Sequence, residues 1–265
     1  MKKIGVSVYA ITCYLAGFAS ILAWIAFTGN LIPAWSIDGT PEMALLPALA
    51  KNLGLVLLFG LHHSIMARQS FKTWLTRYIP THLERSTYVM ASALMITLLM
   101  WQWEPIGGTI WNIPAGTVGY YATYALFFSG WAILFISSFL INHFDLFGLR
   151  QAYLYVTDRP YTPLKFRVIA FYKYVRHPLY FGILLGIWSI PHMTVTHLIY
   201  AIGLTGYLLA GVYYEEKDLV HAFGTLYARY RDKTPKLIPF MKFGARMPSE
   251  AQSAAAVETV TLDSE

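Results

Sequence analysis

Long apolar runs constrain this chain more than any other feature of its sequence. A bilayer core about 30 Å thick is crossed by about 20 helical residues, because each residue of an α-helix rises about 1.5 Å. The runs lie at Val6–Thr28, Leu45–Met66, Thr87–Trp103, Val118–Ile141, Leu179–Ile190 and Thr196–Tyr214. We therefore predict an all-α fold, a polytopic integral membrane bundle of about six transmembrane segments, the last two forming a helical hairpin.

The composition agrees with a bilayer as the solvent. Of the 265 residues, 56% are hydrophobic and 13% are charged, which is far from the balance of soluble proteins. The formal charge of +6 comes from basic residues spread between the apolar runs, so we expect membrane lipids and no nucleic acid as partners. The one cysteine, Cys13, lies in an apolar run, which excludes a disulfide framework, and no set of metal ligands is recognisable.

The connections between the runs alternate in charge. Gly29–Met43 and Glu104–Thr117 contain no Lys or Arg, whereas Ala67–Ser86 contains four basic residues and Asn142–Pro178 contains six. The positive-inside rule places the two basic connections and both termini in the cytoplasm, which an even number of crossings allows. We expect the bacterial cytoplasmic membrane, with an active site facing the cytoplasm. Three tryptophans near the outer ends are expected in an interfacial aromatic belt: Trp101, Trp103 and Trp111.

An ordered set of polar and aromatic residues surrounds the predicted hairpin. Tyr174–Tyr180 reads Tyr-Val-Arg-His-Pro-Leu-Tyr before the first arm, Tyr213–Glu216 follows within the second arm, and Tyr227–Tyr230 lies downstream. The first arm is only about 20 Å long and the second about 30 Å. We therefore expect Arg176 to be recessed by about 10 Å below the level of Glu216. A charge inside a membrane needs a partner or a cavity, so this predicts a polar pocket that opens to the cytoplasm.

Arg-His-Pro-x-Tyr, a hairpin, Glu-Glu and Tyr-x-x-Tyr together resemble the isoprenylcysteine carboxyl methyltransferase and phospholipid N-methyltransferase superfamily. The resemblance implies a methyltransferase that binds S-adenosyl-L-methionine. The residues it implies for cofactor binding are Tyr174, Arg176, His177, Pro178, Leu179, Tyr180, Tyr213, Glu215 and Glu216. Carboxylates suit the amino group of this cofactor, arginine suits its carboxylate, and tyrosine rings suit its sulfonium. The simpler alternative is a lipid-headgroup anchor at Arg176 and a juxtamembrane charge pair with Glu216.

Segments nearer the N-terminus resemble the bacterial NnrU-like branch of that superfamily. They include Leu61–Arg68, Phe71–Trp74, Glu84–Tyr88, Trp101–Trp103 and Ile141–Gln151. This resemblance implies methylation of a small thiol, with methanethiol as the leading expectation and dimethyl sulfide as the product. One alternative is another membrane methyltransferase, acting on a prenylcysteine carboxylate or a lipid amine. An alternative of another class is a haem-binding or accessory membrane protein linked to nitrogen-oxide metabolism.

Removing the thiol proton calls for a base near the cytoplasmic face. His143 ends the fourth apolar run, and Asp145 two residues later is expected to orient its imidazole. His63 and Tyr88 reach the same face from the second and third runs, so they are candidates too. Alternatively, a histidine at a helix C-terminus can have a purely structural role, because it interacts favourably with the helix dipole. Alignment of donor and acceptor without any base remains open as well.

The chain is expected to divide into three parts. Residues 1–141 form an N-terminal four-helix membrane region, and residues 142–248 form the cytoplasmic loop, hairpin and tail of the methyltransferase region. Residues 249–265, which are small and acidic, are expected to be disordered. The sequence does not predict an oligomeric state.

Overall fold

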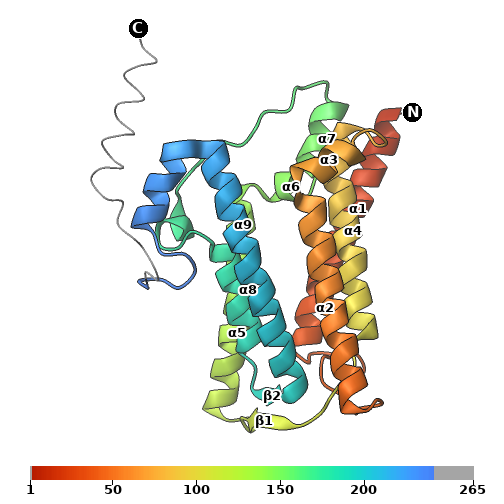
Figure 1. Cartoon of the computed structure of the whole chain (residues 1–265), viewed down its shortest axis with the longest axis vertical. Helices are drawn as coiled ribbons and strands as arrows, with labels where there is room; N and C mark the ends of the chain where they lie inside the picture. Colours follow the sequence, from red (N-terminus) through yellow and green to blue (C-terminus); the bar gives the residue numbers. More distant parts are fainter. Residues whose placement is uncertain (1, 242–265) are drawn as a thin grey trace.

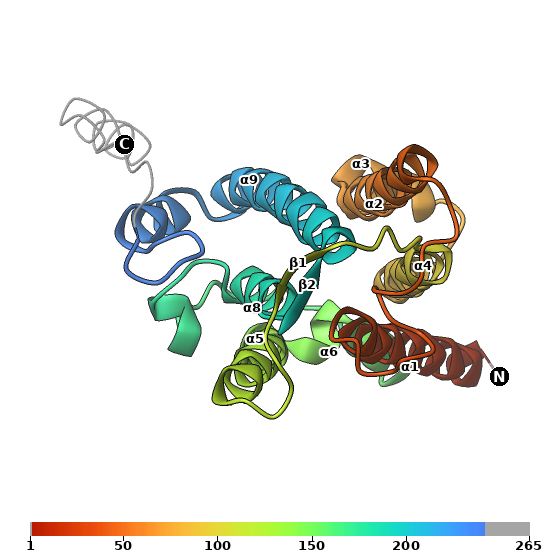
Figure 2. The ribbon, with the colours of Figure 1, turned by 90° about the horizontal axis from the view of Figure 1, so that it is seen from below.

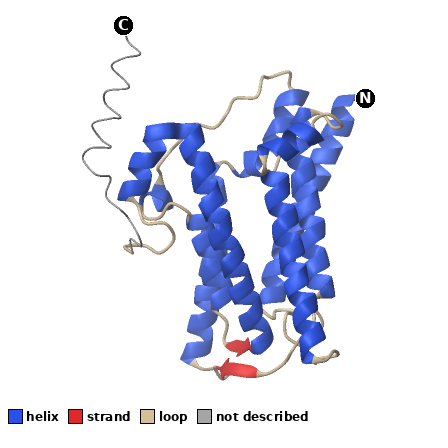
Figure 3. Ribbon diagram, in the orientation of Figure 1, coloured by secondary structure: helices blue, strands red, loops and turns tan. Residues whose placement is uncertain are grey.

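The computed structural model describes residues 2–241, so the predicted disordered tail at 249–265 lies outside the described residues. The principal helices are α1 (Lys2–Thr28), α2 (Leu45–Ala67), α4 (Thr81–Gln102), α5 (Val118–Ile141), α8 (Pro178–Trp188) and α9 (Val195–Lys233) (Figure 1). Shorter elements are α3 (Gln69–Leu75), α6 (His143–Leu146), α7 (Leu149–Val156), a 3-10 helix η1 (Ala170–Lys173), β1 (Thr109–Asn112) and β2 (His192–Thr194). Figure 3 shows that helices dominate, which confirms the predicted class.

Within residues 2–241, four helices are long and apolar enough to cross a membrane, namely α1, α2, α5 and α9. Each lies on a predicted apolar run, and the bounds of α5 agree with those predicted. The helix α8 is apolar but has only 11 residues. The helix α9 continues well beyond its predicted apolar run, to Lys233, and bends where Gly224 adopts φ 54° and ψ −133°.

The helices form two groups, which the view along the bundle in Figure 2 separates clearly. In one group α4 packs against both α1 and α2, and in the other α5 packs against α8. The approach of α5 to α8 depends on glycines, since a Cβ on Gly130 would lie 2.5 Å from the backbone nitrogen of Gly186. The expected boundary after Ile141 therefore assigns α5 and α8 to different parts of the chain, although these two helices pack against each other.

Aromatic side chains join the two groups near the end where α1 and α4 finish and α9 begins. Trp24 on α1 donates a hydrogen bond to the Tyr200 hydroxyl on α9, and its ring packs edge-on against Trp131 at 4.9 Å. Trp103 packs against Tyr200 at 5.3 Å and is only 7% exposed, so its expected place in an interfacial belt is wrong. Trp101 is 72% exposed, because it points to the other side of α4.

A two-stranded antiparallel sheet closes one end of the molecule, where Trp111 of β1 lies opposite Met193 of β2. The Thr196 hydroxyl accepts hydrogen bonds from two backbone N–H groups of the connection before β1. The Asn52 side chain both donates to and accepts from the backbone of Glu104. Only loops were predicted at this end. The candidate functional residues lie at the other end, where the short helices are.

Candidate active site

An ion pair joins the start of α8 to α9 at the motif that the sequence singled out. Nε of Arg176 donates to Oε1 of Glu216 over 2.7 Å, and the two side chains are 9% and 11% exposed. Nη1 of Arg176 also donates to the carbonyl oxygens of Arg231, at 2.7 Å, and of Thr234. The sequence predicted that a recessed Arg176 needs a partner, and Glu216 is that partner.

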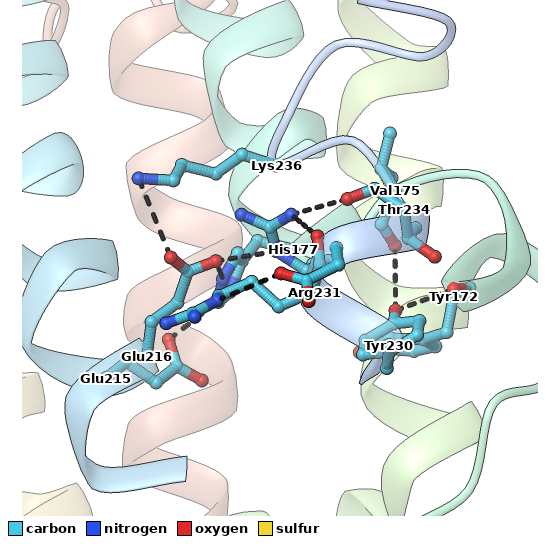
Figure 4. Close-up of polar contacts among 11 residues, drawn as sticks. Tyr172, Val175, His177, Glu215, Glu216, Tyr230, Arg231, Thr234 and Lys236 are labelled. Atoms are coloured by element: carbon cyan, nitrogen blue, oxygen red, sulfur yellow. Dashed lines mark hydrogen bonds and ion pairs between the residues drawn. The ribbon is translucent and has the colours of Figure 1, made fainter. Parts of the chain in front are cut away.

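His177 is buried, and Figure 4 shows it beside the carboxylates of Glu215 and Glu216. Its Nε2 lies 3.1 Å from Oε1 of Glu216, and its Nδ1 lies 3.6 Å from Oε2 of Glu215. Burial alone lowers the pKa of His177, but hydrogen bonding and the negative charges of Glu215 and Glu216 outweigh it and raise the pKa above 6.5. In its protonated form the imidazole donates a charge-assisted hydrogen bond to Glu216.

The C-terminal part of α9 folds back over this cluster. The bend at Gly224 needs a backbone conformation with positive φ that glycine adopts without steric cost. Beyond it, the Tyr230 hydroxyl donates to the Tyr172 carbonyl at 2.6 Å, and the Arg176 N–H donates to the Pro235 carbonyl at 2.9 Å. Sequence reasoning missed Tyr172 and the carbonyls that hold Arg176, although Gly224 in a polar helical stretch was a signal for the bend.

Lys236 is a further residue that sequence reasoning missed. Its Nζ lies 3.6 Å from Oε2 of Glu216, so this carboxylate interacts with Arg176, His177 and Lys236 together. The N–H of His177 donates to the Lys236 carbonyl at 3.1 Å, which ties the fold-back to the start of α8. Lys236 is 43% exposed, so its ammonium lies on the solvent side of Glu216.

Glu215 differs from Glu216 because one of its carboxylate oxygens makes no hydrogen bond to the described residues. Oε2 of Glu215 is buried and makes no hydrogen bond to the described residues, and its nearest cationic neighbour is Nδ1 of His177 at 3.6 Å. The buried Tyr227 hydroxyl also makes no hydrogen bond to them. A buried oxygen without a partner is unfavourable unless a ligand supplies a donor. A ligand with an amino group fits Glu215, and the amino group of S-adenosyl-L-methionine has that chemistry.

The remaining cofactor candidates separate into two kinds. Pro178 and Leu179 open α8, where proline at the first helical position is favourable, and Tyr180 interacts electrostatically with Glu215 and with Tyr88. Tyr174 and Tyr213 are 58% and 52% exposed. Neither of these two side chains joins the cluster, and the Tyr213 ring faces the ammonium of Lys217 at 4.3 Å instead.

The candidate bases His63 and Tyr88 meet across α2 and α4. The Tyr88 hydroxyl lies 2.6 Å from Nε2 of His63, and Nδ1 of His63 lies 3.1 Å from the Ser92 hydroxyl. The Arg85 guanidinium covers the Tyr88 ring at 4.8 Å. His63 and Tyr88 belong to the helix group of α1, α2 and α4, whereas the cluster belongs to the group of α5, α8 and α9.

The predicted His143–Asp145 dyad is wrong. His143 is 1% exposed, and its two ring nitrogens lie 2.8 Å from the Ser138 hydroxyl and 3.2 Å from the Tyr14 hydroxyl. Burial lowers the pKa of His143. The carboxylate of Asp145 instead accepts from Arg150 at 2.7 Å, because α6 turns the two side chains to different sides.

Comparison with known proteins gives clear relatives. The chain is 49% identical over 241 residues to a methanethiol S-methyltransferase of Crocosphaera subtropica, covering 91% of this chain and 94% of that protein. It is 40% identical over 242 residues to a methanethiol S-methyltransferase of Mycobacterium tuberculosis, covering 91% and 98%. Nurim of Sus scrofa is 31% identical over 185 residues, covering 67% of this chain and 70% of Nurim. No protein-family model and no solved structure matches the chain.

Proposed function

This chain belongs to the methanethiol S-methyltransferase family, and from that premise we propose that it transfers a methyl group from S-adenosyl-L-methionine to methanethiol, which gives dimethyl sulfide. The observation that carries the proposal is the buried Oε2 of Glu215, which makes no hydrogen bond to residues 2–241, although Nδ1 of His177 lies 3.6 Å away, beside the Arg176–Glu216 pair. The alternatives of a prenylcysteine, a lipid amine or a haem have no comparable support among the relatives.

The cluster at the start of α8 supplies a group for each charged end of the cofactor. Glu215 binds the amino group, whereas the ammonium of Lys236 and Nη2 of Arg176, which makes no hydrogen bond within residues 2–241, bind the carboxylate. Glu216 holds Arg176 and His177 in place, so it acts as a positioning residue. Tyr180 lies in the first turn of α8, and its ring suits a sulfonium.

S-adenosyl-L-methionine supplies an electrophilic methyl group, and this chain has to supply a thiolate in line with it. We assign that task to the His63–Tyr88 pair in place of His143. The thiol proton passes to the Tyr88 oxygen while the Tyr88 proton moves to Nε2 of His63, which lies 2.6 Å away. The Ser92 hydroxyl at Nδ1 keeps the ring of His63 oriented for this transfer.

His143 has a structural role in this proposal. Its ring stacks on Phe139 at 4.2 Å and packs against Phe147 at 4.6 Å, while hydroxyl groups satisfy both nitrogens. Both ring nitrogens of His63 also lie within hydrogen-bond distance of hydroxyl groups, those of Ser92 and Tyr88. Neither histidine therefore presents a free nitrogen to a haem iron, which argues against axial ligation.

We propose six crossings with both termini in the cytoplasm, α4 and α8 being the two that complete the set. We call Arg176, His177, Glu215, Glu216 and Lys236 the cofactor cluster. The 67–86 connection, with its four basic residues, lies at the same end of the molecule as this cluster. At that end Arg68 pairs with Asp218 of α9 at 3.4 Å and covers the Tyr214 ring at 4.7 Å. The active site then faces the cytoplasm, which contains S-adenosyl-L-methionine, in a bacterial cytoplasmic membrane.

Membranes that contain the protein test the proposal when three acceptors are compared under identical conditions. Methanethiol, a prenylcysteine analogue and phosphatidylethanolamine are each supplied with S-adenosyl-L-methionine labelled in its methyl group. We expect label in dimethyl sulfide and none above background in the other two products. Label in either of those products without labelled dimethyl sulfide would contradict the assignment of a small thiol as acceptor.

A further inference from the structure

A cavity lies apart from the cofactor cluster, at the same end of the molecule. Its volume is about 530 Å³, and it is formed by α3, the first turn of α4, α6, α7 and the connection that follows α7. The lining includes Lys72, Arg85 and Arg159, which come from three different segments. None of the residues proposed to bind the methyl donor lines this cavity.

The charges around the cavity do not cancel. Within residues 2–241, no ion pair involves the side chains of Lys72 or Arg159, and Arg85 uses only its Nε, which donates to the Leu146 carbonyl at 2.7 Å. The carboxylate of Asp145 is neutralised by Arg150 at 2.7 Å. Glu84 is therefore the one acidic group that opposes three cations, and the lining keeps an excess of positive charge.

Three buried polar atoms in the lining have no hydrogen-bond partner among the described residues, namely Nε2 of His82, Oε1 of Glu84 and Oε1 of Gln151. The nitrogen is the one that suits an anion. The ring of His82 stacks on Tyr155 with centroids 3.6 Å apart, which fixes its orientation. A nitrogen held in this way can donate to an acceptor oxygen that a ligand supplies. No side chain caps the first turn of α4, whose partial positive charge adds to that of the cations.

We propose that this cavity is a binding site for a phosphate group of a small molecule or lipid. A phosphate monoester carries about −1.5 to −2 charges at pH 7, which matches the excess positive charge of the lining. Arginine and lysine bind its oxygens directly, and His82 donates to a further oxygen. The Arg85 guanidinium lies 4.8 Å from the centre of the Tyr88 ring, so an occupant also contacts the residue that covers the His63–Tyr88 pair.

The test uses the full-length protein, purified in a neutral detergent, with no methyl donor present. Inorganic phosphate, adenosine monophosphate and a short-chain phosphatidylglycerol are titrated separately by calorimetry. The variant Lys72→Gln/Arg159→Gln removes two cations of the lining, and Lys165→Gln removes an exposed cation of the same connection that does not line the cavity. We expect the double variant to bind at least about tenfold more weakly and Lys165→Gln to bind as the wild type does.

A second variant covers the case in which the double variant does not fold. His82→Phe keeps a ring against Tyr155 but removes the Nε2 donor, so it should also weaken binding. Binding of the soluble phosphates alone assigns the site to a cytosolic phosphate ester, and binding of phosphatidylglycerol alone assigns it to a lipid headgroup. The proposal is overturned if the wild type binds none of the three probes, or if folded double and His82→Phe variants bind with unchanged affinity.

Discussion

At the scale of single residues, the proposed chemistry depends on buried polar atoms and their partners. The residue types of the motif predicted that Arg176, His177 and Glu216 belong together, and the structure brings them within hydrogen-bond distance. The partners Ser92 and Ser138 were not predictable, because a hydroxyl on a neighbouring turn or helix has no signature in sequence. That missing information also led to the wrong pairing of His143 with Asp145.

Tyr88→Phe isolates the proposed proton transfer, because it removes one hydroxyl and keeps the ring. Turnover should fall by about 10²–10⁴-fold while affinity for S-adenosylhomocysteine stays unchanged. Dimethyl sulfide formation and calorimetric titration measure these two quantities separately. Tyr78→Phe on the exposed connection is the matched control and should behave as the wild type does. Normal turnover by Tyr88→Phe at every pH would favour catalysis by alignment alone.

The raised pKa of His177 predicts a pH dependence of stability. A group whose folded pKa lies above its unfolded pKa stabilises the fold below the unfolded value, and this contribution is lost as the pH rises through the folded pKa. The difference in melting temperature between wild type and His177→Asn should therefore be largest below about pH 6.5 and shrink above the folded pKa. Exposed His221 provides the control His221→Asn. A difference that is the same at acid and at alkaline pH would be contrary to this account.

At the scale of elements, α9 both crosses the bundle and supplies the cover of the cofactor cluster. Its apolar part was predictable, because a long apolar run indicates a spanning helix whatever packs around it. The fold-back was not, because the bonds of Arg176 to the Arg231 and Thr234 carbonyls join residues far apart in sequence. The sheet of β1 and β2 was missed for a similar reason, since its strands are short and distant along the chain.

Gly224→Ala tests the fold-back of α9. A Cβ at this position meets no neighbouring atom, so the effect comes from the backbone conformation alone, φ 54° and ψ −133°, and should cost about 1–3 kcal/mol. We expect a lower melting temperature and weaker binding of S-adenosylhomocysteine, since the displaced segment holds Arg176. Gly206→Ala in the same helix also meets open space, at an ordinary helical φ, and should be neutral or slightly stabilising. Equal effects of the two substitutions would show that the bend does not depend on glycine.

At the scale of the whole molecule, two helix groups place the cofactor cluster opposite the His63–Tyr88 pair. The charges of the connections predicted which end of the molecule carries the site, because positive residues concentrate there. The packing of α5 with α8 was not predictable from order along the chain. It depends on the close approach at Gly130 and Gly182, whose backbones contact each other's helices.

The proposed orientation of the whole molecule predicts the result of cysteine labelling in intact cells. Thr40→Cys and Lys165→Cys lie on exposed connections at opposite ends of the bundle, and the native Cys13 is buried. A membrane-impermeant maleimide should label Thr40→Cys in intact cells and Lys165→Cys only after the cells are opened. Labelling of Lys165→Cys from outside would place the cofactor cluster on the wrong side for a cytoplasmic donor.

The most direct test of the account is calorimetric titration of S-adenosylhomocysteine into purified wild type, Glu215→Gln and Glu42→Gln. Glu215→Gln keeps the shape of the side chain but removes the charge that is proposed to bind the amino group. The account predicts 1:1 binding by the wild type, a loss of at least about tenfold in affinity for Glu215→Gln, and no change for Glu42→Gln at the far end. A folded Glu215→Gln variant that binds as tightly as the wild type would contradict it.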